Sequence, residues 1–197
     1  MSDFWNQRFS AAEYIYGTQP NDFFKHCIDT LTPGTILVPG AGEGRDAVYA
    51  ATLGWQVHAF DSSKAGREKA LQLAAAHNVT IQYDLTDVRD FIAAPHSFDA
   101  IGITYFHLPT ELRWPFHYQL GYILRPGGTL FMEMFTPTQL QHASGGPKDI
   151  DLLYTPDMLA ADFKSMQILL NEEQEVTLSE GSYHQGIAHV VRFRAQL

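Results

Sequence analysis

The segment Ile36–Asp46, with the sequence Ile-Leu-Val-Pro-Gly-Ala-Gly-Glu-Gly-Arg-Asp, constrains the fold of this chain more than any other feature. A short apolar run ends at Pro39, glycines follow at alternate positions, and a helical pattern extends over 43–53. Strand, glycine-rich turn and helix in this order are typical of the first β-α-β unit of a nucleotide-binding fold, although plain turns also match such a pattern. Because glycine lacks a Cβ, it adopts positive φ and lets a ligand approach the backbone, where N–H groups at the helix start are free.

A carboxylate at the end of the second apolar run strengthens this prediction. The run 56–60 ends at Asp61, 21 residues after Gly40. At the carboxyl end of the second strand, a carboxylate can accept hydrogen bonds from both hydroxyls of an adenosyl ribose. The glycine spacing is Gly-x-Gly-x-Gly with Arg45 next, which differs from the Gly-x-Gly-x-x-Gly of dinucleotide sites. A P-loop is excluded, because the chain has no Gly-x-x-x-x-Gly-Lys-Ser/Thr.

The composition indicates one globular domain over residues 1–197. The chain is 45% hydrophobic and 18% charged, and it is long enough for a sizeable core. Its net charge of −9 repels phosphate backbones, so we expect no nucleic-acid partner. The sequence has no signal-peptide pattern and no apolar run as long as a membrane span. Together with the single cysteine, Cys27, these features indicate a cytoplasmic enzyme.

Strand and helix patterns alternate along the chain. The expected strands cover about 36–38, 56–61, 79–85, 97–104, 129–135, 166–178 and 184–194. The residues expected to cap helices are Asn21, Ser62, Thr110 and Thr155. The pattern predicts an α/β, Rossmann-like, doubly wound sheet of seven mostly parallel strands, with an antiparallel strand at the C-terminal edge and helices on both faces.

The ligand site of such a sheet lies outside the carboxyl ends of its strands, where the strand order reverses. Four sequence features fall at these ends: 40–44, Asp61, Asp84 and 104–107. Four separate signals therefore indicate one crevice.

Two segments are expected to cover this crevice. Residues 1–30 begin with an aromatic-rich stretch in which Trp5, Arg8 and Phe9 share one helical face, so they predict an N-terminal helical lid; the alternative is a helix that only packs on the core. Residues 136–154 form a long, turn-rich segment after the strand 129–135. Because long loops are uncommon unless they are functional, this segment predicts a substrate lid.

These residues together resemble the Rossmann-like methyltransferases that depend on S-adenosyl-L-methionine (SAM). The segments 38–46, 4–9 and 14–21 resemble the tellurite-resistance and thiopurine methyltransferase branch of that superfamily. Leu124–Gly128 resembles the turn before the fifth strand of the superfamily, and Leu178–Gly186 resembles the tellurite-resistance type. The resemblance covers nearly the whole chain and is stronger for the cofactor than for the methyl acceptor.

The resemblance implies SAM as cofactor and S-adenosyl-L-homocysteine as product. The residues that it implies for cofactor binding are Trp5, Arg8, Tyr16, Gly40, Ala41, Gly42, Asp61, Ser62, Asp84, Leu85 and Thr104. In this scheme Arg8 pairs with the cofactor's carboxylate, Asp61 binds the ribose, and Asp84 accepts from the adenine amino group. Many methyltransferases carry an acidic residue where this chain has Val38, so the group that holds the cofactor's amino group stays open.

Methyl transfer from a sulfonium is a single displacement, so the enzyme mainly aligns the reactants and excludes water. An acceptor that arrives ionised, such as a thiolate, tellurite or selenite, needs no general base. For a protonated acceptor His107 is the candidate base, unless its ring only binds a loop carbonyl. Tyr105 is a second candidate catalytic residue, and Tyr154 and His184 are further candidates at the rim, although such residues are more often structural.

Two other functions remain open. A nicotinamide-dependent oxidoreductase fits the fold and Asp61, but the glycine spacing and the missing Tyr-x-x-x-Lys disfavour it. A non-catalytic SAM-binding sensor is the second alternative, and the long lid disfavours it. His184 and His189 are five positions apart and face opposite sides of a regular strand, so we expect no metal site. The expected partner is a small-molecule methyl acceptor, while its identity and the oligomeric state stay open.

Overall fold

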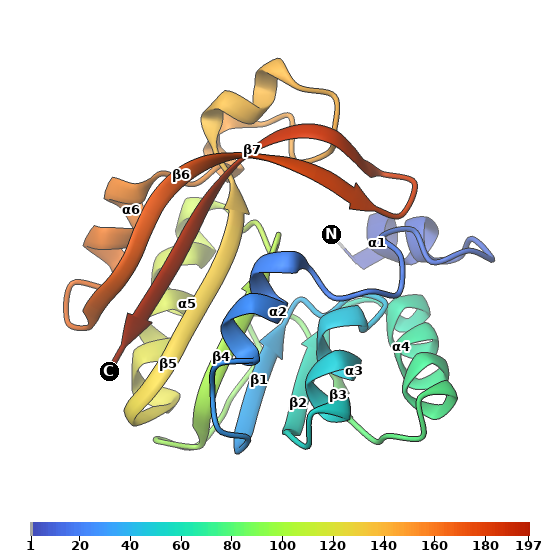
Figure 1. Cartoon of the computed structure of the whole chain (residues 1–197), viewed down its shortest axis with the longest axis horizontal. Coiled ribbons are helices and arrows are strands. Elements are labelled where there is room, and N and C mark those ends of the chain that lie inside the picture. The colour runs from blue at the N-terminus through green and yellow to red at the C-terminus, as the bar shows by residue number, and fades with distance from the viewer. Residues whose placement is uncertain (1) are drawn as a thin grey trace.

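A seven-stranded sheet forms the centre of the molecule (Figure 1). The computed structural model describes residues 2–197, so Met1, the first residue of the expected lid 1–30, lies outside the described residues. The strands are β1 (Thr35–Pro39), β2 (Gln56–Asp61), β3 (Gln82–Leu85), β4 (Phe98–Thr104), β5 (Leu124–Phe135), β6 (Gln167–Glu180) and β7 (His184–Gln196). Their order is β3-β2-β1-β4-β5-β7-β6; β1 to β5 pair in parallel, and β7 runs antiparallel to both β5 and β6. The predicted Rossmann-like α/β fold is confirmed.

Helices cover both faces of this sheet (Figure 1). The helices are α1 (Ser2–Phe9), α2 (Asp22–Ile28), α3 (Arg45–Thr52), α4 (Lys64–Ala76), α5 (Thr110–Ile123) and α6 (Pro156–Asp162), with short 3₁₀ helices η1 (Pro137–Gln141) and η2 (Ile150–Leu152). One apolar cluster joins α2, α3 and α4 to β1 and β2, and another joins α5 and α6 to β4, β5 and β7. No helix occupies 86–97; there the Phe91 ring stacks on Phe60, with centroids 4.3 Å apart.

The central strand β1 shows why its sequence is a continuous apolar run. Ile36 and Val38 belong to the cluster under α2 and α3, whereas Leu37 belongs to the cluster under α5. All three side chains are buried. A parallel strand covered on both faces needs apolar residues at every position, because successive side chains point to opposite faces.

Two of the four expected helix caps are confirmed and two are wrong. The Asn21 side chain accepts from the N–H of Phe24, and that of Thr155 accepts from the N–H of Met158. Helix α4 is capped by Ser63 and not by Ser62, because the Asp61 carboxylate accepts the N–H of Ser63 and places the Ser63 hydroxyl at the first turn.

Helix α5 also starts differently from the prediction. Pro109 occupies the capping position with extended backbone, and Thr110 is the first helical residue without capping contacts. Pro115 is accommodated within this helix. The third strand is shorter than expected, because Val79 and Ile81 pack against the α3 and α4 side chains before β3 begins.

The β6–β7 hairpin arches over the carboxyl edge of the sheet and reaches the N-terminal segment near α1 (Figure 1). At its tip the Ser182 N–H donates to the carbonyl of Ile15, 3.0 Å away, and Gly181 packs against Gly17. Segments from the two ends of the chain therefore close over the same edge. No helix in residues 2–197 has both the length and the apolar character that a membrane span needs.

Candidate active site

The glycine turn between β1 and α3 has the geometry that its sequence predicts. Gly40, Gly42 and Gly44 have φ values of 59°, 53° and 88°, which favour glycine. A Cβ on Gly40 would lie 2.2 Å from the Phe106 ring, and one on Gly42 would lie 3.2 Å from the Phe9 ring. The positive φ therefore favours glycine at both positions, and crowding by the Phe106 ring adds to this at Gly40.

Asp61 lies directly beside this turn. One carboxylate oxygen accepts the N–H of Gly42 at 3.1 Å, and the other accepts the N–H of Ser63 at 2.8 Å. Burial raises the pKa of Asp61, while these amide donors oppose that rise. Each carboxylate oxygen has more than one acceptor site, so hydroxyl donors of a ribose can still bind.

The strand register places the expected adenine contacts at the same edge. Leu85 pairs with Asp61 across β2 and β3, and Asp84 pairs with Phe60. Asp84 and Leu85 are exposed, whereas Ser62 is half-buried next to Asp61. The glycine turn, the Asp61 carboxylate and these strand-end residues therefore lie at one edge of the sheet, as expected for a site that binds an adenosyl group.

Helix α1 covers the turn from outside. The side-chain oxygen of Asn6 accepts from the Ser63 hydroxyl at 3.0 Å and from the Ala65 N–H at 3.2 Å, which fixes α1 on the start of α4. Phe9 is buried against Gly42 and Gly66. Helix α1 therefore lies where a lid over the cofactor would lie.

The structure also brings together Trp5, Arg8 and Tyr16. Trp5 stacks on Phe9, and Arg8 donates to the Tyr16 hydroxyl at 3.0 Å while its guanidinium lies 4.7 Å from the Tyr183 ring centroid. Arg8 has no carboxylate partner within residues 2–197. A guanidinium without a carboxylate partner suits the anionic end of a ligand.

His107 is held by the backbone on both sides. Its Nδ1 lies 2.7 Å from the Leu152 carbonyl, and its Nε2 accepts from the N–H of Phe135 at 3.3 Å. Burial lowers the pKa of His107 to about 4. A neutral ring with both nitrogens engaged fits the structural alternative for His107 better than the role of general base.

Thr104 is the last residue of β4, and Tyr105 follows it into a second polar region. The Tyr105 hydroxyl donates to Glu133 at 2.6 Å, and burial beside Glu133 raises the pKa of Tyr105 well above its ordinary value. Tyr105 therefore keeps its proton at neutral pH. The buried carboxylate of Asp46 accepts the N–H of Asn21 at 2.7 Å.

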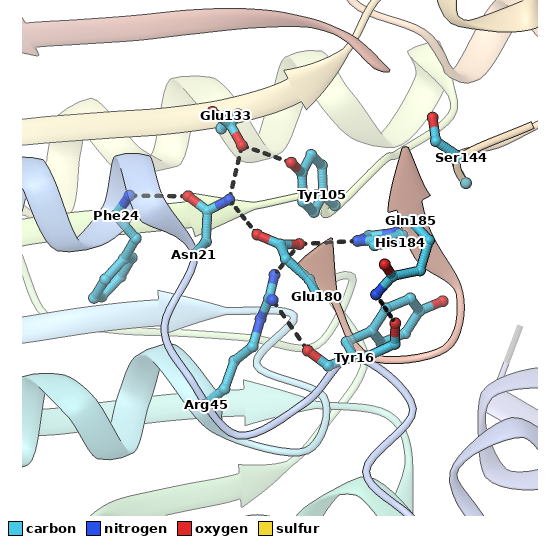
Figure 2. A network of polar contacts seen from close by, with 12 residues as sticks. Tyr16, Asn21, Phe24, Arg45, Tyr105, Glu133, Ser144, Glu180, His184 and Gln185 are labelled. Atoms are coloured by element: carbon cyan, nitrogen blue, oxygen red, sulfur yellow. Dashed lines mark hydrogen bonds and ion pairs between the residues drawn. The ribbon is translucent and has the colours of Figure 1, made fainter. Parts of the chain in front are cut away.

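Figure 2 shows a polar network that the sequence did not predict. Asn21 donates to Glu133 at 2.7 Å and to Glu180 at 2.9 Å. Arg45 pairs with Glu180 at 2.9 Å and donates to the Tyr16 carbonyl. Glu180 also contacts His184, and its pKa is lowered to about 2, because the hydrogen bond from His184 and the charge of Arg45 outweigh the opposing effect of burial. Two features of the sequence could have indicated this network. Glu133 is a lone charge in an apolar strand, and Arg45 directly follows the three glycines.

The segment 136–154 folds back on this network. Ser144 donates to the carbonyl of Ile187 in β7, at 2.6 Å. Gly145 follows with φ of 126° and lies against the His184 ring. The expected lid segment therefore contacts the β7 end of the network.

A cavity of about 230 Å³ adjoins the network on the α2 side, between residues 16–22 and 176–181. Glu133 and Arg192 contribute to its wall. Within residues 2–197, no group of three or more histidine, cysteine and acidic side chains could hold a metal ion.

Residues 36–128 match the family model described as "Methyltransferase domain". This range holds the glycine turn, Asp61, Asp84 and the segment after β4. No curated protein sequence matches the chain.

Solved structures of low sequence identity share the whole fold. One, described as "Conversion of a Disulfide Bond into a Thioacetal Group during Echinomycin Biosynthesis", has a TM-score of 0.80 at 17% identity and covers 100% of this chain and 92% of its own. TehB from Haemophilus influenzae has a TM-score of 0.74 at 16% identity, over 99% of this chain and 66% of TehB. The N-methyltransferase NodS from Bradyrhizobium japonicum, in complex with S-adenosyl-L-homocysteine, has a TM-score of 0.75 at 12% identity, over 99% and 97%.

Residues 36–128 match a methyltransferase domain, and the whole chain shares its fold with solved SAM-dependent methyltransferases. The domain match and the shared fold support SAM as the cofactor of this protein.

Proposed function

We propose that this protein transfers the methyl group of SAM to a small-molecule acceptor by direct displacement. The hydrogen bond between the Asp61 carboxylate and the Gly42 N–H, 3.1 Å long, carries this proposal. It holds the Asp61 carboxylate beside the glycine turn, so a single adenosyl group would contact both. The glycine spacing favours SAM over a dinucleotide.

The residues of the chain have separate tasks in this proposal. Gly40, Ala41 and Gly42 let the cofactor approach the backbone, Asp61 binds its ribose, and Ser62, Asp84 and Leu85 border its adenine. Trp5, Arg8 and Tyr16 cover the amino-acid end, and Thr104 borders the reacting centre. Bound SAM supplies an activated methyl group, so the protein has to orient the acceptor and exclude water.

In this proposal helix α1 and the segment 136–154 are two lids that exclude water from the site. Helix α1 is fixed over the glycine turn through Asn6, and the segment 136–154 lies against β7 through Ser144. A sensor would need no such cover, so this arrangement favours an enzyme. Thiols and chalcogen oxyanions such as tellurite or selenite are the acceptor classes that the resemblance to the tellurite-resistance branch suggests.

Calorimetric titration with SAM, S-adenosyl-L-homocysteine and NADH tests the cofactor. We expect micromolar binding of both adenosyl ligands and at least tenfold weaker binding by Asp61→Ala, because the variant loses the ribose acceptors and the bond to Gly42. The matched control is Glu173→Gln, since Glu173 is an exposed carboxylate on β6.

Each alternative function has its own outcome. Binding of NADH alone would contradict the proposal in favour of an oxidoreductase. Binding of SAM without turnover of thiols, selenite or tellurite would favour the sensor.

A further inference from the structure

His184 and Glu180 form a histidine–carboxylate pair at the centre of the polar network (Figure 2). His184 Nδ1 lies 3.1 Å from a carboxylate oxygen of Glu180, across the turn of the β6–β7 hairpin. Arg45 holds the same oxygen at 2.9 Å, and Asn21 holds the other at 2.9 Å. Because Glu180 is ionised, it accepts hydrogen bonds only, so Nδ1 must carry the proton. The other ring nitrogen, Nε2, is then the one that can accept a proton.

Nε2 has no hydrogen-bond partner in the part of the chain that the structure describes. A Cβ on Gly145 would lie 3.0 Å from Nε2 and 2.5 Å from the neighbouring ring carbon. Gly145 therefore packs closely on this edge of the ring, and a side chain at this position would clash with the ring and cover Nε2. His107, in contrast, uses both of its nitrogens in backbone contacts.

Aromatic rings surround the imidazole on its remaining sides. Ring centroids of Tyr16, Tyr105 and Phe135 lie 4.5, 4.8 and 5.4 Å from that of His184. Tyr16 and Tyr105 belong to the segments expected around the amino-acid end and the sulfonium of SAM. Nε2 therefore lies between the segments expected around the methyl donor and the segment 136–154.

We propose that His184 is the general base of this enzyme, that Glu180 positions it, and that the acceptor is a neutral thiol rather than a preformed chalcogen oxyanion. This inference rests on the proposed methyl transfer.

The charges around His184 favour a neutral acceptor. The charged and titratable groups that face it from the elements packed against it are Glu180 of β6, Arg45 of α3, Tyr16, Tyr105, Glu133 of β5 and His107. Arg45 is already paired with Glu180, and Arg192 with Glu133. Arg8 has no carboxylate partner within residues 2–197, but the proposed function assigns it to the carboxylate of SAM. A tellurite or selenite anion would therefore meet the Glu180 and Glu133 carboxylates without a further unpaired guanidinium beside them. A thiol instead suits the aromatic faces, because sulfur is polarizable and makes favourable contacts with rings.

Acid–base chemistry also favours a thiol. Burial lowers the pKa of His184, although Glu180 opposes this effect, so the ring is neutral at pH 7. A thiol has an ordinary pKa of about 8.5, within reach of an imidazole base, whereas an alcohol is far less acidic. In the step, the acceptor S–H bond breaks and its proton moves to Nε2. The sulfur electron pair forms the new S–CH₃ bond while the sulfonium C–S bond breaks, giving a thioether, S-adenosyl-L-homocysteine and imidazolium, which then releases one proton to water.

The test compares His184→Gln with the matched control His189→Gln, which alters the other histidine of β7. Acceptor probes are benzyl mercaptan, 2-mercaptoethanol, sodium selenite and sodium tellurite, after SAM binding has been measured for each protein. We expect His184→Gln to bind SAM within threefold of wild type and to methylate the thiols at least 100-fold more slowly at pH 7. The deficit should shrink toward pH 9, where the thiol ionises by itself. The control should keep wild-type rates.

A readout that does not depend on turnover is the tautomer of His184, measured by ¹⁵N NMR of the wild-type protein. We expect protonated Nδ1 and unprotonated Nε2 at pH 7, and a mixture of tautomers in Glu180→Gln. This measurement keeps the proposal testable even if His184→Gln does not fold.

The outcomes separate the two proposals. If the wild type does not bind SAM, the proposed function is overturned, and this inference with it. Three outcomes overturn this inference alone, provided that the wild type binds SAM. They are full thiol methylation by His184→Gln, an Nε2–H tautomer of His184 in the wild type, and faster turnover of selenite or tellurite than of thiols. SAM binding without turnover of any thiol probe also overturns it.

Discussion

Glu133 and Arg192 face each other across the β5–β7 ladder, and their side chains meet with an Nε–Oε distance of 2.6 Å. Glu133 is only 1% exposed and also accepts from Asn21 and Tyr105. One carboxylate therefore links the N-terminal segment, the end of β4 and the C-terminal hairpin.

Replacing one partner of this pair should destabilise the fold strongly. Glu133→Met leaves Arg192 without its carboxylate and leaves two donors without an acceptor, so we expect a loss of about 3 kcal/mol in unfolding free energy. The double variant with Arg192→Met should recover part of that loss, because no unpaired charge remains. Urea unfolding measures both values. The exposed Glu173→Gln serves as control, and a Glu133→Met protein as stable as this control would contradict the expectation.

The glycine turn offers a second test with an internal control. Gly42 and Gly54 both have positive φ, but a Cβ on Gly42 would meet Phe9, whereas one on Gly54 meets nothing within 4 Å. Alanine at either position should cost about 1 kcal/mol of stability through backbone strain. Only Gly42→Ala should weaken SAM binding, by at least tenfold in calorimetry, because it alone fills the space beside the expected ligand. Equal effects of the two variants on binding would mean that the turn does not hold the cofactor.

Local patterns were sufficient to predict most of the fold. The apolar run of β1, the three glycines and the carboxylate after β2 each act over short stretches of chain, and parallel strands align their ends. The polar network could not be predicted, because Asn21, Glu133 and Glu180 are separated by more than forty residues from one another. Their meeting depends on the β5–β7 and β6–β7 registers, which a sequence of alternating residues does not specify.

The sequence alone does not determine whether Ser62 or Ser63 caps α4. Ser62 and Ser63 are both good capping residues, and the choice between them depends on where the Asp61 carboxylate points. It accepts the N–H of Ser63, so the helix starts one residue later than expected.

We expect helix α1 to open and close over the glycine turn. Asn6→Ala leaves the Ser63 hydroxyl and the Ala65 N–H without their acceptor, so we expect the opening of α1 to become about tenfold more frequent, which corresponds to about 1.4 kcal/mol. Hydrogen exchange of residues 4–9 measures this opening, and S-adenosyl-L-homocysteine should slow it in the wild type. The control is Gln7→Ala, an exposed position on the same helix. Exchange that the ligand does not slow would contradict a lid role for α1.

His107 should make the fold sensitive to acid. Its folded pKa of about 4 lies below the ordinary value of 6.5, so the folded state favours the neutral ring. The stabilisation is fully present above pH 6.5 and is lost as the pH falls from 6.5 toward 4, because the unfolded chain binds the proton more readily. The shift corresponds to at most about 3 kcal/mol.

The measurement is the unfolding free energy in urea between pH 7 and pH 4, compared with that of His107→Gln. A glutamine amide can still donate to the Leu152 carbonyl but does not titrate. The variant should therefore lose less stability than the wild type over this range, although other groups titrate in both proteins. Parallel curves for the two proteins would show that folding does not lower the pKa of His107, and would restore it as a candidate base.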